Sequence, residues 1–268
     1  MSATARFRAL HEGSRAFLMP NAWDAGSARV LSGLGFAAVA TSSGACANVL
    51  GKLDGNVTRE EALAHARALV EAVEIPVSAD LEKGFGDAPE DAAETIRRAA
   101  AIGLAGGSIE DASGDAAKPI YDLAHATERV AAAAEAARAS GFVLTARAEN
   151  FLHGRADLDD TVRRLQAFEK AGADVLFAPG LPTLEAVRTV CSAVTKPVSF
   201  MVAIRGKSFT VAELQEAGVR RISFASSLYR AAMTGLIAAA AEIRDRGTFT
   251  YLDRSLPSGE IGQHMRKR

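Results

Sequence analysis

Cysteine is nearly absent from this sequence of 268 residues, which contains only Cys46 and Cys191. Two cysteines exclude a disulfide framework, and no group of cysteines and histidines has the spacing of a zinc site. An excess of one charge is also lacking, because 31 lysine and arginine residues balance 32 aspartate and glutamate residues. Since no run of basic residues stands out either, nucleic acid is not an expected partner.

Long apolar runs are missing as well. The N-terminal segment lacks the apolar core of a signal peptide, and no uncharged stretch is long enough to span a bilayer. We therefore expect a cytoplasmic protein with no membrane partner. What the sequence does have is 49% hydrophobic residues, which excludes a disordered chain, and enough length for one large domain or two small ones.

One pattern recurs along the chain: a short apolar segment, a polar or glycine-rich turn, and an alanine-rich amphipathic stretch. Two of these stretches, 90–103 and 159–172, have apolar residues at helical spacing and end in glycine. Continuous apolar strands that alternate with helices are typical of a parallel sheet covered by helices. The expected strands are 17–20, 37–41, 76–80, 106–110, 142–147, 174–178, 197–201 and 221–225.

Eight such units in a chain of this length predict an α/β fold of the (β/α)₈ TIM barrel type. The alternative is an open, doubly wound sheet, but that fold usually carries G-x-G-x-x-G after its first strand, and here the turn reads N-A-W-D-A-G-S. The pattern stops near residue 245. We expect a barrel domain over 1–245 and a C-terminal extension over 246–268, lying on the surface or on a neighbouring subunit.

Acidic residues gather where three of the expected strands end or the following loops begin. Asp80 and Glu82 follow the third strand, Glu110 ends the fourth, and Asp54 lies in the long loop after the second. Carboxyl ends of barrel strands share one face, and crowded carboxylates repel one another unless a cation lies among them. Mg²⁺ is the simplest such cation, with Asp80 as its best direct ligand. The alternative is that some of these acids cap helices or form surface ion pairs.

Two further features could bind an anion at the same face. Arg147 ends the fifth apolar strand, and its planar guanidinium suits a substrate carboxylate, although an internal ion pair with Glu110 or Glu149 is the alternative. Ser43, Gly44 and Ala45 offer successive backbone N–H groups in a tight turn, which could hold an oxyanion or could be a plain turn.

The ordered motifs of the chain resemble the isocitrate lyase/phosphoenolpyruvate mutase superfamily. They cover about residues 15–235, and the most specific is the acidic-x-acidic-x-Gly-aromatic-Gly segment at 80–86, which I-E-D and a strand-ending arginine follow. The motifs are N-A-W-D-A-G-S-A-R, T-S-S-G-A, L-D-G, D-L-E-K-G-F-G, S-I-E-D and T-A-R-A-E.

This resemblance implies a (β/α)₈ barrel whose last helix commonly swaps onto a neighbouring subunit, in a homodimer or homotetramer. It implies Mg²⁺, with Mn²⁺ as the alternative ion, and a small 2-oxo or 2-hydroxy carboxylate as substrate. It implies that Asp80 binds the metal directly and that Glu82, Glu110 and Asp54 bind the metal or its water. It also implies that Ser43, Gly44 and Ala45 bind substrate oxygens and that Arg147 binds a substrate carboxylate. Trp23 and Asp24 match a loop that covers the substrate.

The chain departs from the superfamily pattern after the fourth strand. The lyases carry Lys-Lys-Cys-Gly-His in a mobile loop there, whereas this chain reads D-A-S-G-D-A-A-K-P-I-Y-D at 111–122. Lys118 or Tyr121 could supply a proton in place of the missing cysteine, and a solvated surface loop is the alternative. In addition, Lys83 replaces the usual small hydroxyl residue, which weakens the prediction of phosphoryl chemistry.

We therefore predict a Mg²⁺-dependent carbon–carbon lyase of the decarboxylase or retro-aldol type, which forms an enolate. Its expected catalytic residues are Arg147, Glu110 and Lys118. Two alternatives stay open: phosphonopyruvate-type cleavage or rearrangement of a phosphorus–carbon bond, and a protein that binds a 2-oxo acid without turning it over.

Overall fold

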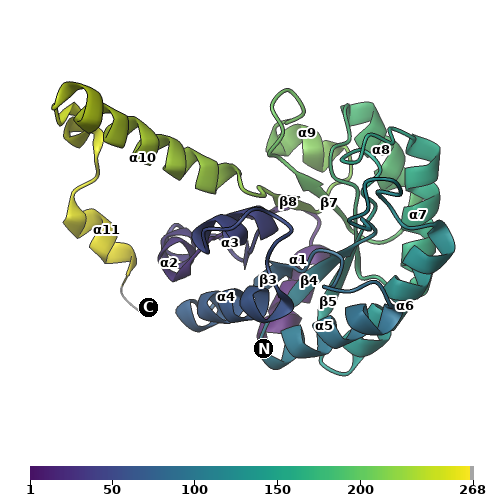
Figure 1. The fold of residues 1–268 in the computed structure, drawn as a ribbon. Helices are drawn as coiled ribbons and strands as arrows, with labels where there is room; N and C mark the ends of the chain where they lie inside the picture. The colour runs from purple at the N-terminus through teal and green to yellow at the C-terminus, as the bar shows by residue number, and fades with distance from the viewer. Residues whose placement is uncertain (266–268) are drawn as a thin grey trace.

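The computed structural model describes residues 1–265, and its centre is one sheet of eight parallel strands (Figure 1). The strands are hydrogen-bonded in the order β1-β8-β7-β6-β5-β4-β3-β2. All eight expected strands are present, most of them one or two residues shorter than predicted. They are β1 Phe17–Met19, β2 Val39–Ala40, β3 Val77–Asp80, β4 Gly106–Glu110, β5 Val143–Arg147, β6 Val175–Phe177, β7 Val198–Met201 and β8 Arg221–Ser223.

The sheet closes into a barrel through Asn21 at the end of β1. Asn21 forms an isolated parallel bridge with Ala40, and its side-chain amide donates to the Thr41 carbonyl oxygen over 2.5 Å. Its side-chain oxygen accepts the Phe224 N–H, 2.8 Å away, just after β8. One buried side chain therefore ties the ends of β1, β2 and β8 together, and the predicted (β/α)₈ barrel is confirmed.

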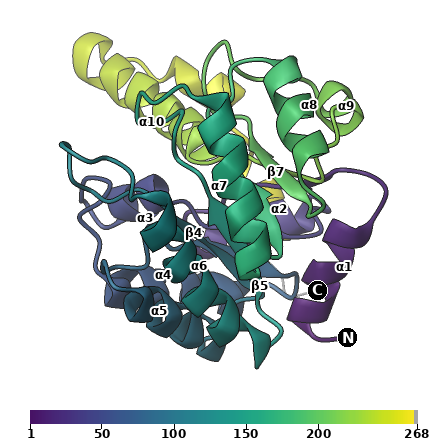
Figure 2. The ribbon, with the colours of Figure 1, turned by 90° about the vertical axis from the view of Figure 1, so that its right-hand side faces the viewer.

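Helices occupy the connections and cover the outside of the barrel (Figure 2). The two helices expected from periodicity are present: α5 begins with Pro89 at its first turn, and α7 ends at Gly172 in the left-handed conformation. The helices are α1 Ala3–Glu12, α2 Ala25–Gly33, α3 Ser43–Val49, α4 Arg59–Ala72, α5 Pro89–Ala101, α6 Leu123–Arg138, α7 Leu158–Ala171, α8 Leu184–Ala193, α9 Val211–Glu216, α10 Ser227–Arg246 and α11 Ser258–His264, with a 3₁₀ helix η1 at Thr250–Arg254.

Helix α1 packs against the end of the barrel at which the strands begin. Phe7 is fully buried there in a cluster with Met19, Val143 and Val175. Gly106, at the start of β4, has to be a glycine, since a Cβ on it would lie 2.7 Å from the Phe7 ring. The base of the barrel is thereby sealed, and a ligand has access from the opposite face, where the strands end.

The segment 227–265, here called the C-terminal arm, leaves the barrel after β8 (Figure 1). Helix α10 projects away and buries none of its residues, and Leu236 and Ile237 are 60% and 67% exposed. The chain then returns, and α11 packs on α2, where Arg29 donates to the Met265 carbonyl oxygen over 2.8 Å. The predicted boundary at 245 falls at the end of α10, and residues 266–268 of the predicted extension lie outside the described residues.

No helix within residues 1–265 combines the length and the apolar character that crossing a membrane requires.

Candidate active site

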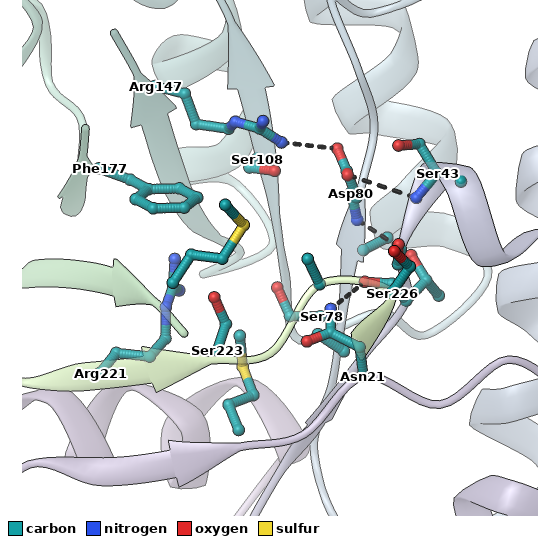
Figure 3. A pocket seen from close by; sticks show the side chains of 18 of the residues that line it. Asn21, Ser43, Ser78, Asp80, Ser108, Arg147, Phe177, Arg221, Ser223 and Ser226 are labelled. Carbon is teal, nitrogen blue, oxygen red and sulfur yellow. Dashed lines mark hydrogen bonds and ion pairs between the residues drawn. The ribbon is translucent and has the colours of Figure 1, made fainter. Parts of the chain in front are cut away.

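A pocket of about 200 Å³ opens at the face where the strands end (Figure 3). Five of the predicted site residues line it together: Asp80, Arg147, Asp54, Ser43 and Gly44. Hydroxyl groups from several strands and loops make up much of the remaining wall. Its lining residues are Met19, Asn21, Ala40, Thr41, Ser42, Ser43, Gly44, Asp54, Ser78, Ala79, Asp80, Ser108, Arg147, Leu152, Phe177, Met201, Arg221, Ser223, Ala225 and Ser226.

The four predicted metal ligands do not all face this pocket. Asp80 and Asp54 line it, whereas Glu82 faces a small neighbouring cavity that shares Asp80 and contains Cys46 and His65. Glu110 lines neither of these cavities. Within residues 1–265 there is no cluster of three or more acidic, histidine or cysteine side chains placed to hold a metal directly. A cation at this face would therefore have only one or two direct carboxylate ligands and would keep water, as Mg²⁺ often does.

The acids at the mouth raise one another's proton affinity. Burial, followed by the charges of Asp80 and Asp54, raises the pKa of Glu82 to about 7. Burial and the Asp80 charge also raise the pKa of Asp54. Burial raises the pKa of Glu110 well above its usual value, against the opposing effect of Arg147. Negative charge is thus in excess at the mouth, and a bound cation would relieve it.

Arg147 is surrounded by three carboxylates. Its guanidinium lies 3.0 Å from Asp80, 3.3 Å from Glu110 and 2.8 Å from Glu149. Burial opposes the charge of Arg147, but the three acids raise the pKa of its guanidinium well above the ordinary value. The internal ion pair, which was the alternative to carboxylate binding, is therefore present in this structure. Its planar face also lies over the Phe177 ring, with 5.3 Å between the guanidinium carbon and the ring centroid.

Ser43, Gly44 and Ala45 form the first turn of helix α3 and not the isolated tight turn expected from the sequence. Ser42 caps that helix, and the Ser43 N–H donates to an Asp80 carboxylate oxygen 3.3 Å away. The Gly44 N–H has no acceptor within residues 1–265, as expected for the start of a helix. A Cβ on Gly44 would lie 3.1 Å from an Asp54 carboxylate oxygen, so glycine lets that acid approach the backbone.

Trp23 and Asp24 do not line the pocket. Asp24 caps α2, because its carboxylate accepts the Ser27 N–H over 2.6 Å. The Trp23 ring packs edge to face on Tyr229 of α10, with 5.7 Å between the ring centroids. Trp23 thus connects the loop after β1 with the start of the C-terminal arm.

Lys118 lies in a second cavity, which it shares with Asp87, Tyr121 and Arg164. Its loop is folded onto itself by an antiparallel bridge between Ala112 and Ile120. Lys83 also points toward this loop, since its ammonium group donates to Asp87 over 2.6 Å and to the Ser113 carbonyl oxygen over 2.7 Å. Neither lysine lines the first pocket, so neither contacts a ligand there in this conformation.

The sequence prediction missed Arg221, and it did not anticipate the left-handed backbone of Glu82, an expected metal ligand, or of Ala225, which lines the pocket. Arg221 begins β8 and lines the pocket, and its signal was an arginine within an apolar strand, the same signal that indicated Arg147. Glu82 and Ala225 both have a left-handed backbone, with φ of 49° and 44°. Such conformations are costly for residues with a side chain and concentrate at functional sites. No sequence pattern marks them.

Comparison with known proteins places this fold and pocket in a family. The family model described as phosphoenolpyruvate phosphomutase matches residues 7–244, nearly the whole barrel and α10. This chain belongs to the phosphoenolpyruvate mutase/isocitrate lyase superfamily. Its relatives are lyases and mutases, so the chain is an enzyme of that superfamily, and the non-catalytic alternative loses its support.

Three relatives illustrate the match. A crystal structure from Burkholderia cenocepacia J2315, provisionally described as a lyase/mutase, has 49% sequence identity and a TM-score of 0.95, covering 97% of this chain and 94% of the other. The crystal structure of 2,3-dimethylmalate lyase has 27% identity and a TM-score of 0.88, covering 98% of this chain and 94% of the other. The 2-methylisocitrate lyase of Escherichia coli strain K12 is 29% identical over 71% of this chain and 67% of its own length.

Proposed function

We propose that this enzyme is a Mg²⁺-dependent carbon–carbon lyase that acts on a small 2-oxo or 2-hydroxy carboxylate through an enolate. The observation that supports it is the gathering of Asp80, Asp54 and the Ser43–Gly44 amides in one pocket at the face where the strands end. Curated relatives include 2,3-dimethylmalate lyase from Eubacterium barkeri, which is 31% identical, and oxaloacetate decarboxylase from Rhodopseudomonas palustris strain BisA53, which is 28% identical.

The residues present fit a hard divalent cation. Asp80 and Asp54 offer carboxylate oxygens in the pocket, and the acid-rich mouth favours positive charge. Superfamily members are typically dependent on a divalent metal. Asp80 and Asp54 would hold the ion, with Glu82 and Glu110 acting through water. When bound, Mg²⁺ would act as a Lewis acid and favour negative charge on substrate oxygens.

The chain's own groups have three tasks in this reaction. The Gly44 N–H would donate to the substrate oxygen on which negative charge develops. Arg147 would orient the Asp80 and Glu110 carboxylates that it contacts, and it would bind a substrate carboxylate if one displaced Asp80 from its guanidinium. The proton that the enolate needs would come from Lys118 or Tyr121 after a movement of their loop, or from water.

A turnover assay tests this proposal. Purified enzyme with Mg²⁺ is incubated with oxaloacetate, 2,3-dimethylmalate, 2-methylisocitrate and phosphonopyruvate, and cleavage products are quantified. We expect cleavage of at least one of the first three acids, and Asp80→Asn should reduce it about 100-fold or more. Asp159→Asn, an exposed acid on α7, is the matched control and should leave the rate unchanged. Cleavage that survives both chelation and Asp80→Asn would contradict the proposal.

Phosphorus–carbon chemistry is the second candidate, because one structural neighbour favours it. A crystal structure from Burkholderia cenocepacia J2315, provisionally described as a phosphonomutase, has 35% identity and a TM-score of 0.82 over 90% of this chain. Against it, Lys83 occupies the motif position of the usual small hydroxyl and points away to Asp87. Turnover of phosphonopyruvate alone in the same assay would favour this candidate.

We also propose that the enzyme is a homodimer or homotetramer that joins through the C-terminal arm. The apolar side chains of α10 lie uncovered in the single chain, as do Phe249, Leu252 and Leu256 beyond it. A second copy would cover this surface. Replacing Leu236 and Ile237 with glutamate should yield monomers in analytical ultracentrifugation, while exchange of the exposed Glu90 on α5 for glutamine should not.

A further inference from the structure

Arg221 is a buried cation without an acidic partner. Arg221 is the first residue of β8. Its side chain points into the barrel, and the residue is 3% exposed. Its hydrogen-bond partners are neutral: Ser199 Oγ at 3.0 Å, Thr145 Oγ1 at 3.1 Å and His11 Nε2 at 3.4 Å. A guanidinium has five N–H groups, so two of them have no acceptor within residues 1–265. No carboxylate in that part of the chain forms an ion pair with it.

The histidine beneath Arg221 cannot supply the missing negative charge. His11 Nδ1 lies 2.8 Å from the Phe7 carbonyl oxygen, which only accepts, so Nδ1 carries the proton and Nε2 is the acceptor. Burial and the Arg221 charge lower the pKa of His11 to about 3, so the ring is neutral. It provides an acceptor for the guanidinium and no countercharge.

A charge so deeply buried is costly unless an opposite charge compensates it. Arg147, the other arginine of the pocket, has three carboxylates for this purpose, and its own charge makes the surroundings of Arg221 more positive. Burial and that repulsion lower the pKa of Arg221 to about 9, which still leaves it charged at neutral pH. The inner side of the pocket therefore has an unmatched positive charge.

The pocket leaves space in which an anion could reach the Arg221 guanidinium. Arg221 and Asp80 lie on opposite sides of it in Figure 3, and both line the same cavity. The barrel positions between them include Ser78, Ser108 and Ser223, where a filled barrel core would have bulky branched residues. These small polar side chains leave space and line the same pocket as the guanidinium.

We propose that Arg221 binds a second, remote carboxylate of the substrate, while the 2-oxo or 2-hydroxy end lies at Asp80 and Gly44. The enzyme would thus select acids with two carboxylates over acids with one. This inference rests on the proposed function for the position of the first end of the substrate. Arg221 is then a substrate-binding residue that sets specificity.

A matched pair of unreactive ligands tests this. Malate and 2-hydroxybutyrate share the 2-hydroxy carboxylate end and the number of carbons, and differ by a carboxylate in place of a methyl group. Titration calorimetry with Mg²⁺-loaded enzyme should show malate binding about 30-fold more tightly, the effect of a charge-assisted hydrogen bond. This comparison needs no variant, so it does not depend on whether an altered barrel folds.

Variants then assign the preference to one side chain. Arg221→Gln should lower malate affinity about 30-fold and leave 2-hydroxybutyrate binding unchanged, whereas Arg221→Lys should retain part of the preference. Arg220→Gln is the matched control, because Arg220 is the neighbouring arginine and its side chain, among residues 1–265, donates only to the Gly218 and Val219 carbonyl oxygens. Thermal unfolding in buffer without organic acid confirms that each variant is folded.

The possible failures are distinguishable. Equal binding of the two acids to the wild-type enzyme would overturn the role of Arg221 and leave the proposed function standing. A malate preference that survives in Arg221→Gln would also overturn it. If neither acid binds in the presence of Mg²⁺, the proposed substrate class fails, and the inference fails with it.

Discussion

Two buried arginines line the same pocket in opposite settings. Arg147, at the end of β5, contacts Asp80, Glu110 and Glu149 within 3.3 Å. Arg221, at the start of β8, contacts only neutral oxygen and nitrogen acceptors. The first has more negative charge around it than it can neutralise, and the second has none. The pocket is therefore polarised, with its acidic part suited to a cation and its inner part suited to an anion.

This difference indicates how a small ligand would be oriented. Under the proposed function, a metal at the acidic end and an anion at the inner end would impose one direction on a substrate that carries a 2-oxo carboxylate at one end and a second carboxylate at the other. Arg147 is less suited than Arg221 to a remote carboxylate, because it would first have to exchange one of its three paired acids.

Replacing Arg147 should destabilise the folded protein much more than replacing Arg221, and this difference is the largest effect that we expect. Arg147→Met leaves one buried and two partly buried acids without a countercharge and should lower the free energy of unfolding by about 3–5 kcal/mol. Arg221→Met removes a charge that nothing compensates, so in buffer without organic acid the loss should be below about 1 kcal/mol.

Urea denaturation followed by circular dichroism measures both values. Arg220→Met serves as the control for loss of a partly exposed arginine directly before β8. Equal losses from Arg147→Met and Arg221→Met would mean that Arg221 has a negative partner in the folded protein, and the contrast between the two arginines would disappear.

The sequence predicts the acidic residues around Arg147 more readily than it predicts the role of Arg221. Asp80, Glu110 and Arg147 end apolar strands, and parallel strands bring their ends to one face, so their proximity follows from the repeat alone. Arg221 also belongs to an expected strand, but at its beginning, where a side chain ordinarily contributes to packing. Whether such a residue faces the barrel or the helices depends on strand tilt and register, which the sequence does not state.

Other misses have similar physical causes. The eight strands were predicted because each is a compact apolar run between polar turns. The sequence predicts a turn at Ser43–Ala45, since a helix of seven residues is too short to show a period. Lys118 was expected at the reaction centre because its loop follows β4, yet local bonds such as the Ala112–Ile120 bridge hold that loop beside a second cavity.

Because His11 is neutral in the folded protein, the free energy of unfolding should depend on pH, with a change of about 2 kcal/mol between pH 8 and pH 5. The pKa of His11 is about 3 in the folded protein and about 6.5 in an unfolded chain, so protons bind preferentially to the unfolded state. This histidine's contribution is therefore complete above pH 6.5, falls as the pH decreases, and amounts to about 2 kcal/mol of lost stability at pH 5.

The acids of the mouth titrate in the same range, so the comparison has to be with His11→Gln, which cannot take up the proton. The difference in free energy of unfolding between wild type and His11→Gln should change by about 2 kcal/mol between pH 8 and pH 5, in favour of the variant at low pH. A constant difference would show that His11 is protonated in the folded protein, and Arg221 would then face a charged neighbour.

The smallest effect that we expect concerns Gly44, on the acidic side of the pocket. In Gly44→Ala the new methyl group would lie 3.1 Å from an Asp54 carboxylate oxygen, so Asp54 has to shift by a few tenths of an ångström. Because the Gly44 backbone is not left-handed, the substitution should not strain the chain, and stability should change little.

We expect kcat/KM for the cleaved acid to fall about tenfold, with a weaker apparent affinity for Mg²⁺, since both depend on the position of one carboxylate. Gly13→Ala, just after α1, is the matched control, because its added methyl would make only an ordinary contact, 3.6 Å from the Leu10 carbonyl oxygen. If Gly44→Ala leaves both Mg²⁺ affinity and turnover intact, Asp54 does not take part in metal binding, and the cation-binding side of the pocket would depend on Asp80 alone.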